Sequence, residues 1–229
     1  MIRKFKALGI ASMVVFAFTA VAAQTAAAGE TYTSGAGAGA TTFITGEKTS
    51  NHVFSTPNGT VSCTSITFKG EAVQTGPAAH EITINPTYSG CTAFGFATAH
   101  VTNNGCHYLF TTPTEIAPGK WTIHPPHIVP TSGSSCNFQI TPTTFGVSVC
   151  TQTVPNQTPT KGHIIAVNRT GSSPADVDLE TTIEGIHYTG TGGVCGDGTT
   201  HSDATYTGNA TVKGFSDAAH TKQIAVSIS

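Results

Sequence analysis

Residues 86–108 read Pro86-Thr-Tyr-Ser-Gly-Cys-Thr-Ala-Phe-Gly-Phe-Ala-Thr-Ala-His-Val-Thr-Asn-Asn-Gly-Cys-His-Tyr108. This stretch holds two of the six cysteines, a glycine-rich corner, an alternating run and an Asn-Gly pair, which is a strong local signal for a tight β-hairpin. The residues on both sides repeat the same pattern of short alternating runs between turns. The pattern predicts small antiparallel strands that are joined by turns and cross-linked by disulfides.

Two alternating runs precede this stretch. In residues 60–68 and again in residues 81–85, side chains alternate with the two-residue period of a strand. A loop with a Gly-Pro pair lies between the runs, so we expect them to form an antiparallel hairpin. That arrangement brings Cys63 close to Cys91.

Two more hairpins are predicted further along the chain. A type I′ turn at Asn104-Gly105 would pair residues 94–102 with 106–110 and set Val101 opposite Tyr108. Cys91 would then lie about a dozen residues back along an extended strand, beyond disulfide distance of Cys106. Residues 136–140 and 146–150 predict a hairpin across residues 141–144. Its better apolar register conflicts with a Cys136–Cys150 bridge.

The rest of the body also shows strand periods. Runs at 163–167, 176–183, 204–213 and 223–228 alternate, and helical spacing is absent outside the N-terminal segment. In the second run, Val177, Leu179, Thr181 and Ile183 are expected to face inward. Short strands with frequent turn signals predict an all-β protein, an antiparallel β-sandwich or open barrel.

The chain begins with the features of a signal peptide. Three basic residues precede an apolar run and then small residues, which predicts a signal peptide over residues 1–28, with an uncleaved anchor as the alternative. A flexible Gly/Ala-rich leader is expected at 29–46 and an all-β body at 47–229, with a possible subdivision near 155–160. We therefore expect a secreted protein with no membrane span after cleavage.

The composition narrows the classes of partner. Charged residues make up 10% of the chain, against about 25% in an ordinary domain. Removing residues 1–28 takes away three basic residues and moves the formal charge from −2 to −5. The sequence does not favour binding to nucleic acid, which requires a clustered basic surface. It contains no phosphate-cradling motif, and no cofactor is predicted.

The cysteine count predicts three disulfides, because six cysteines in a secreted chain are expected to be paired. We rank the pairs 63–91 and 136–150 first, which leaves 106–195 by elimination. Zinc binding is the rival interpretation, but no Cys-x-x-Cys pair is present. The predicted disulfide residues are Cys63, Cys91, Cys106, Cys136, Cys150 and Cys195.

No catalytic residue and no metal site is predicted. The groups closest to a metal-binding pattern are two histidines three residues apart, acidic residues on one strand and a Gly-rich loop with aspartates. For each group, an exposed polar surface is the favoured interpretation. The residues concerned are His124, His127, Asp176, Asp178, Glu180 and Asp197.

One resemblance to known proteins can be stated. The runs Tyr88-Ser-Gly-Cys-Thr-Ala-Phe-Gly95, Asn104-Gly-Cys-His-Tyr108, Ile186-His-Tyr-Thr-Gly190 and Tyr206-Thr-Gly-Asn-Ala-Thr-Val-Lys-Gly214 make the chain similar to secreted, cysteine-containing actinobacterial proteins of unassigned function. The resemblance implies secretion and an all-β body. The resemblance does not assign any functional residue in this sequence.

Three functions fit these expectations. The first is a non-enzymatic extracellular or cell-surface binding module, in which an exposed Trp121 would stack on a glycan or an apolar ligand. Its partner is unknown, with a glycan or a cell-envelope component as candidates. The second is a secreted carboxylate- or metal-dependent hydrolase, and the third is a structural envelope component. The hydrolase requires two of these carboxylates in one cleft: Glu81, Glu115, Asp176, Asp178, Glu180, Glu184 and Asp197.

Overall fold

A computed structural model describes residues 30–37, 39–74 and 78–229. The predicted signal peptide, 1–28, lies outside these residues. The described part is built from antiparallel strands with one short 3-10 turn, at Gly193–Cys195. None of its helical segments has the length and apolar character needed to cross a membrane.

The strands of the first half of the chain are β1 (Tyr32–Ser34), β2 (Thr41–Lys48), β3 (His52–Thr56), β4 (Gly59–Val73), β5 (Ile82–Ala93), β6 (Ala97–Thr102), β7 (Cys106–Phe110), β8 (Thr114–Ala117) and β9 (Lys120–Ile123). Those of the second half are β10 (His127–Pro130), β11 (Asn137–Thr144), β12 (Val147–Ser148), β13 (Thr151–Pro155), β14 (Lys161–Asn168), β15 (Val177–Gly192), β16 (Gly196–Phe215), β17 (Gln223–Ile224) and β18 (Val226–Ile228).

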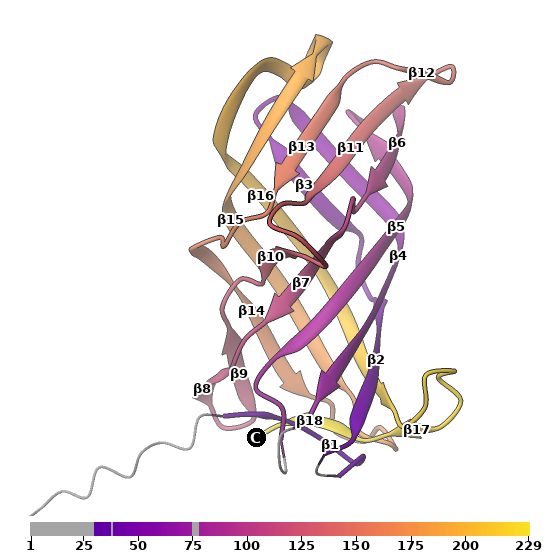
Figure 1. Cartoon of the computed structure of the whole chain (residues 1–229), viewed down its shortest axis with the longest axis vertical. Helices are drawn as coiled ribbons and strands as arrows, with labels where there is room; N and C mark the ends of the chain where they lie inside the picture. Colours follow the sequence, from indigo (N-terminus) through magenta and orange to yellow (C-terminus); the bar gives the residue numbers. More distant parts are fainter. Residues whose placement is uncertain (1–29, 38, 75–77) are drawn as a thin grey trace, which may run out of the picture.

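Eight of these strands close into a barrel (Figure 1). The order around the ring is β16, β2, β4, β5, β6, β11, β13 and β15, and the long β15–β16 hairpin completes the circle. Closure leaves no unpaired edge in the ring, which an open sheet would expose. The all-β antiparallel prediction is confirmed, and of the two expected architectures a barrel forms, although it is closed rather than open.

Some positions in the wall are filled by two strands in succession along the barrel axis. β2 and β3 both lie between β16 and β4, one beyond the other. β6 and β7 both pair with β5, and β13 and β14 both pair with β15. The possible subdivision near 155–160 therefore falls inside one continuous wall.

The wall has a seam in its lower half, between β10 and the β14–β9 pair. Within the described residues, no strand ladder joins β10 to either of these strands. Two backbone hydrogen bonds cross near the seam, between Ile128 and Gln157, at 2.8 and 3.0 Å. Three prolines in the connections beside the seam are buried: Pro125, Pro126 and Pro159.

The lower end of the barrel is covered by both ends of the described chain (Figure 1). β1 pairs with β18 there, and Tyr32 pairs with Ala79. The predicted leader at 29–46 is wrong in this respect, because part of it is β1 and residues 41–46 are wall strand β2. The body begins well before residue 47.

Two of the three predicted hairpins need correction. Residues 60–68 and 81–85 do pair, as parts of β4 and β5. Across Asn104-Gly105 no hairpin forms among the described residues, because β6 and β7 run in line along the same partner, β5. The third hairpin turns at Phe145-Gly146 rather than at 141–144, so that Ile140 lies opposite Gln152.

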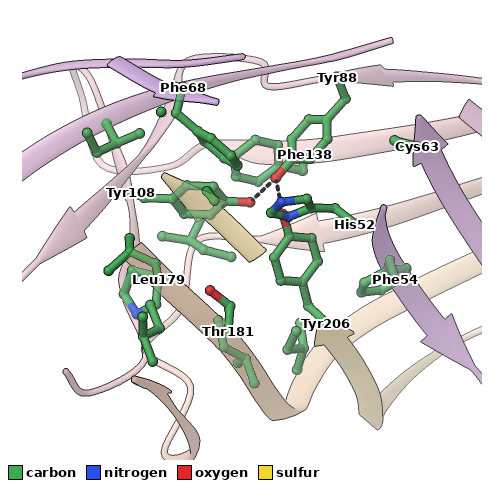
Figure 2. A pocket seen from close by; sticks show the side chains of 18 of the residues that line it. His52, Phe54, Cys63, Phe68, Tyr88, Tyr108, Phe138, Leu179, Thr181 and Tyr206 are labelled. Atoms are coloured by element: carbon green, nitrogen blue, oxygen red, sulfur yellow. Dashed lines mark hydrogen bonds between the residues drawn. The ribbon is translucent and has the colours of Figure 1, made fainter. Parts of the chain in front are cut away.

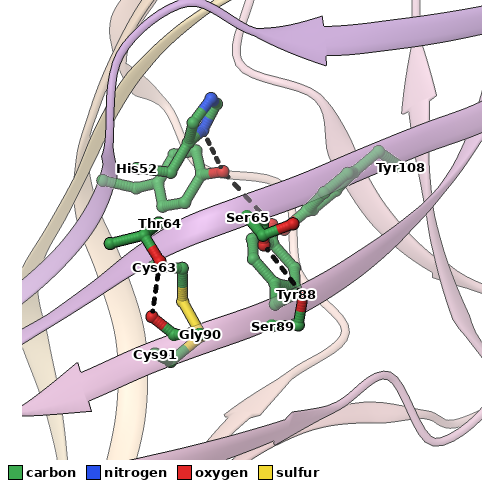
Figure 3. Close-up of a disulfide and its surroundings, with 10 residues drawn as sticks. His52, Cys63, Thr64, Ser65, Tyr88, Ser89, Gly90, Cys91 and Tyr108 are labelled. Atoms are coloured by element: carbon green, nitrogen blue, oxygen red, sulfur yellow. Dashed lines mark hydrogen bonds between the residues drawn. A yellow bond between two sulfur atoms is a disulfide. The ribbon is translucent and has the colours of Figure 1, made fainter.

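All six cysteines are paired, as predicted, but only one of the ranked pairs is right. Cys63 and Cys91 lie directly opposite each other on β4 and β5 and form a disulfide (Figure 3). The other two bridges are Cys106–Cys136 and Cys150–Cys195. The ranked pairs 136–150 and 106–195 are wrong because the shifted hairpin carries Cys150 beyond β11 to the tip of the β15–β16 hairpin.

Beside the first disulfide, the alternation of inward- and outward-facing side chains along β4 and β5 shifts by one residue. Val61 and Cys63 are buried, but so are Ile66 and, partly, Phe68, which the simple alternation placed on the opposite face. The change occurs opposite Gly90, whose φ of 60° is rarely adopted by other residues. This local twist turns Tyr88 into the barrel on the far side of the kink.

Candidate binding cavity

The barrel encloses an apolar cavity of about 130 Å³. Its lining comes from strands all around the wall and, at the seam, from Pro126, Ile128 and Pro159. A smaller cavity of about 70 Å³ lies towards the β1–β18 end, and the two share lining residues. The shared residues are Ile44, Ile84, Phe110, Leu179 and Val212.

A chain of hydrogen-bonded side chains crosses the larger cavity (Figure 2). The Tyr108 and Tyr88 hydroxyls are 2.8 Å apart, and the Tyr88 and Tyr206 hydroxyls are 3.2 Å apart. Tyr206 is 2.7 Å from Nδ1 of His52, and Nε2 of His52 is 3.1 Å from the backbone carbonyl oxygen of Asn209. These side chains come from β3, β5, β7 and β16, so the chain exists only in the closed barrel.

Aromatic neighbours hold these rings in place. Tyr108 stacks on Phe138, with ring centroids 5.2 Å apart, and Tyr88 meets the same ring edge-on. His52 packs against Phe68 and Tyr206. Such packing fixes the orientation of the hydroxyls in advance of any ligand.

Burial keeps the four hydrogen-bonded side chains uncharged. It raises the pKa of Tyr88, Tyr108 and Tyr206 well above 10, so all three phenols keep their protons. Burial also lowers the pKa of His52 below 6.5, and the positive charge of Lys48 lowers it further. The hydrogen bond to Asn209 offsets only part of this shift, so His52 is neutral at pH 7.

Acid is expected to destabilise the protein through His52. The unfolded chain takes up this proton near pH 6.5, whereas the folded chain takes it up only at a lower pH. The free energy of unfolding should therefore fall as the pH drops through 6.5, by up to about 1.4 kcal/mol per pH unit for one proton.

Urea unfolding of the wild type and of His52→Gln between pH 8 and pH 5 measures this effect. The difference in stability between the two proteins should shrink towards pH 5. His163→Gln, at an exposed position on β14, is the control and should leave the pH dependence unchanged. A constant difference between wild type and His52→Gln would contradict the assignment.

The residues predicted from the sequence lie away from this cavity. Trp121 is in β9 and only 6% exposed, so the expectation of an exposed stacking ring is wrong. Trp121 packs in the lower core and lines neither interior cavity. Val177, Leu179, Thr181 and Ile183 face inward, as predicted, and line the two cavities.

The predicted acidic and histidine groups do not come together. The exposed surface expected for the acidic group is wrong for Asp176, which is buried and accepts a hydrogen bond from Gln223. Asp178 is exposed, as expected, and accepts a hydrogen bond from Thr211. Thr199 donates to Asp197 through its hydroxyl and its backbone N–H, which lowers the pKa of that carboxyl. Glu180 and His124 are exposed, and His127 opens β10.

Among the described residues, no group of three or more His, Cys, Asp or Glu side chains is placed to hold a metal ion. The carboxylates that a hydrolase would require are equally scattered. An outer groove beside β4 and β5 contains Glu81, but neither it nor the two interior cavities is lined by any other member of the predicted set.

The sequence analysis missed His52, Tyr88, Tyr108 and Tyr206 as site residues. A signal was present, because Tyr88 and Tyr206 each open a Tyr-Ser/Thr-Gly tripeptide. In the strand pattern, Tyr88 also shares the inward face with Ile84 and Pro86. Large polar aromatics at inward positions of predicted strands are the feature that would have indicated an internal site.

Comparison with known proteins adds no identity. The chain matches no family model, no curated protein and no solved structure. The resemblance to actinobacterial secreted proteins therefore stays a prediction.

Proposed function

We propose that this protein is secreted and binds one small, largely apolar molecule inside its barrel. The observation that carries the proposal is the apolar cavity of about 130 Å³ with a neutral hydrogen-bonded chain across it. Closed barrels of eight strands are either filled by their own side chains or hold one small ligand, and the cavity here favours the second case. An apolar cavity of roughly 150 Å³ in another protein stays dry and binds benzene.

Secretion is supported by two features. Three disulfides suit an oxidising compartment, and the N-terminal segment has the pattern of a signal peptide. This retains the extracellular binding function expected from the sequence but moves the site from an exposed tryptophan to the barrel interior.

The seam offers the easiest route for a ligand. Pro126, Ile128 and Pro159 line the cavity at the seam, and proline rings have no backbone N–H with which to build a ladder. Two backbone hydrogen bonds link Ile128 to Gln157, and the Gln157 side chain is anchored to the backbone of His187 at 2.8 Å. Local opening here breaks fewer bonds than opening between laddered strands.

Thermal melts of residues 29–229, produced with the disulfides formed, test the proposal. Toluene and p-cresol should each raise the midpoint, since a ligand that binds only the folded state stabilises it by about 2.7 kcal/mol at a hundredfold excess over its Kd. Ala210→Leu fills the cavity and should abolish the shift. Thr207→Leu, at an exposed position on the same strand, should retain it.

The measurements on the wild-type protein decide whether the proposal stands. If neither compound changes its midpoint, and neither perturbs its NMR spectrum, the cavity does not bind small apolar molecules and the proposal fails.

A further inference from the structure

We propose that the cavity selects a neutral ligand that carries a hydrogen-bond donor, and that a hydroxyl group on an apolar body fits best. This rests on the proposed function and specifies the class of molecule. The argument uses the direction of the hydrogen bonds in the chain from Tyr108 to Asn209.

The donor-to-acceptor direction of these hydrogen bonds is fixed at the Asn209 end. A backbone carbonyl oxygen can only accept, so Nε2 of His52 must carry the proton that points at it. Nδ1 of the neutral ring is then an acceptor, and the Tyr206 hydroxyl must donate to it. If His52 were protonated, both ring nitrogens would donate and the chain would run the other way.

The direction of each remaining hydrogen bond follows from the direction of the one before it. Tyr206 has given its single proton to His52, so it accepts from Tyr88. Tyr88 has given its proton to Tyr206, so it accepts from Tyr108. Tyr108 is the last member, and its proton is engaged while its oxygen still has free lone pairs. The chain therefore presents an acceptor, and no donor, to a ligand.

Thr181 extends this preference. Its side chain faces the same cavity as Tyr108 (Figure 2), and a threonine hydroxyl both donates and accepts. A ligand hydroxyl is able to donate to Tyr108 and to accept from Thr181. An ether or a ketone has nothing to offer Tyr108.

An anionic ligand is disfavoured. Among the described residues that line the cavity there is no Lys or Arg, so the carboxylate of a ligand would have no cationic partner. Burying an unpaired charge in an apolar cavity costs far more than burying a hydroxyl. The best ligand is thus a neutral molecule such as a phenol or a compact alcohol.

Three probes of similar shape separate the possibilities. p-Cresol has a hydroxyl donor, anisole has only an ether oxygen, and toluene has no polar group. At pH 8, where His52 is neutral, isothermal titration should show p-cresol binding at least about fivefold more tightly than anisole or toluene, the value of one net hydrogen bond.

Tyr108→Phe should reduce this preference, because the ligand hydroxyl loses its acceptor at Tyr108 and keeps only Thr181 as a partner. The variant should still fold, because the Tyr88 hydroxyl keeps its donation to Tyr206. Tyr188→Phe is the matched control and should retain the preference. The Tyr188 hydroxyl is buried, takes no part in the hydrogen-bonded chain from Tyr108 to Asn209 and does not line the cavity.

The two proposals fail in different ways. If the three probes bind with equal affinity, or if Tyr108→Phe leaves the preference for p-cresol undiminished, the donor selectivity is wrong while the binding function stands. Tighter binding of anisole than of p-cresol would also overturn the donor selectivity, because the protein would then supply the donor, from Thr181 or from Tyr108. If no probe binds, the binding function itself is wrong.

Discussion

The double variant Cys106→Ala, Cys136→Ala is expected to lose about 3.5 kcal/mol of unfolding free energy. The bridge closes a loop with a sequence separation of 30 residues, and freeing such a loop in the unfolded chain costs stability of this size. Within the described residues β7 and β11 share no ladder, and the bridge links β7 to the residue that precedes β11. The segment that it closes contains β8, β9 and β10, of which β9 and β10 border the seam.

Guanidinium unfolding of the double variant measures the loss. The control is Cys63→Ala, Cys91→Ala, whose separation of 28 residues gives nearly the same loss from the unfolded chain. Because β4 and β5 remain laddered without that bridge, the control should lose less than the Cys106–Cys136 variant. A loss below about 1 kcal/mol for the first variant, on the scale of ordinary substitutions, would contradict the role assigned to this bridge.

Local patterns predicted the part of the fold that depends on local pairing. The alternation in residues 60–68 and 81–85 indicated a hairpin, and the hairpin placed Cys63 opposite Cys91. The same period placed Leu179 and Ile183 inside. In these elements the side-chain pattern and the nearest strand in sequence point to the same arrangement.

Long-range pairing overrode the other local signals. The Asn104-Gly105 pair favours a hairpin, but β5 is long enough to pair with both flanking strands, which therefore follow each other along it. β11 likewise extends through Pro142 to pair with β6, which moves its turn to Phe145. No local signal in residues 136–150 shows that β6 will be its neighbour.

The candidate site depends on the same long-range closure. His52 and Tyr206 are 154 residues apart in sequence, and Tyr88 and Tyr206 are 118 apart. Strand periods can place each ring on an inner face, but they do not show which strands meet across the barrel. The one-residue shift opposite Gly90 also moves Tyr88 relative to the alternation of the first half of β4.

Gly208→Ala is expected to be the most damaging single substitution in the site, with a loss of about 3 kcal/mol. A Cβ atom at position 208 would stand 2.7 Å from Cδ2 of the His52 imidazole and nearer still to Cγ and Nδ1. The ring is 3% exposed and is held at both nitrogens, so moving it away from the new methyl group breaks its hydrogen bonds. Overpacking a buried site in this way costs about 1–3 kcal/mol, and breaking the bond to Tyr206 adds to it.

The substitution also separates a general packing defect from a specific effect on the chain. If His52 is displaced, Tyr206 loses its acceptor, and the variant should lose both the acid-dependent destabilisation that depends on His52 and the preference for p-cresol over toluene. Gly35→Ala is the matched control, since its Cβ would meet Ile224 at an ordinary 3.5 Å, and it should change neither property. A Gly208→Ala protein that unfolds more easily but keeps both properties would show that the barrel tolerates a shifted His52. Another group would then have to set the direction of the hydrogen bonds from Tyr108 to Asn209.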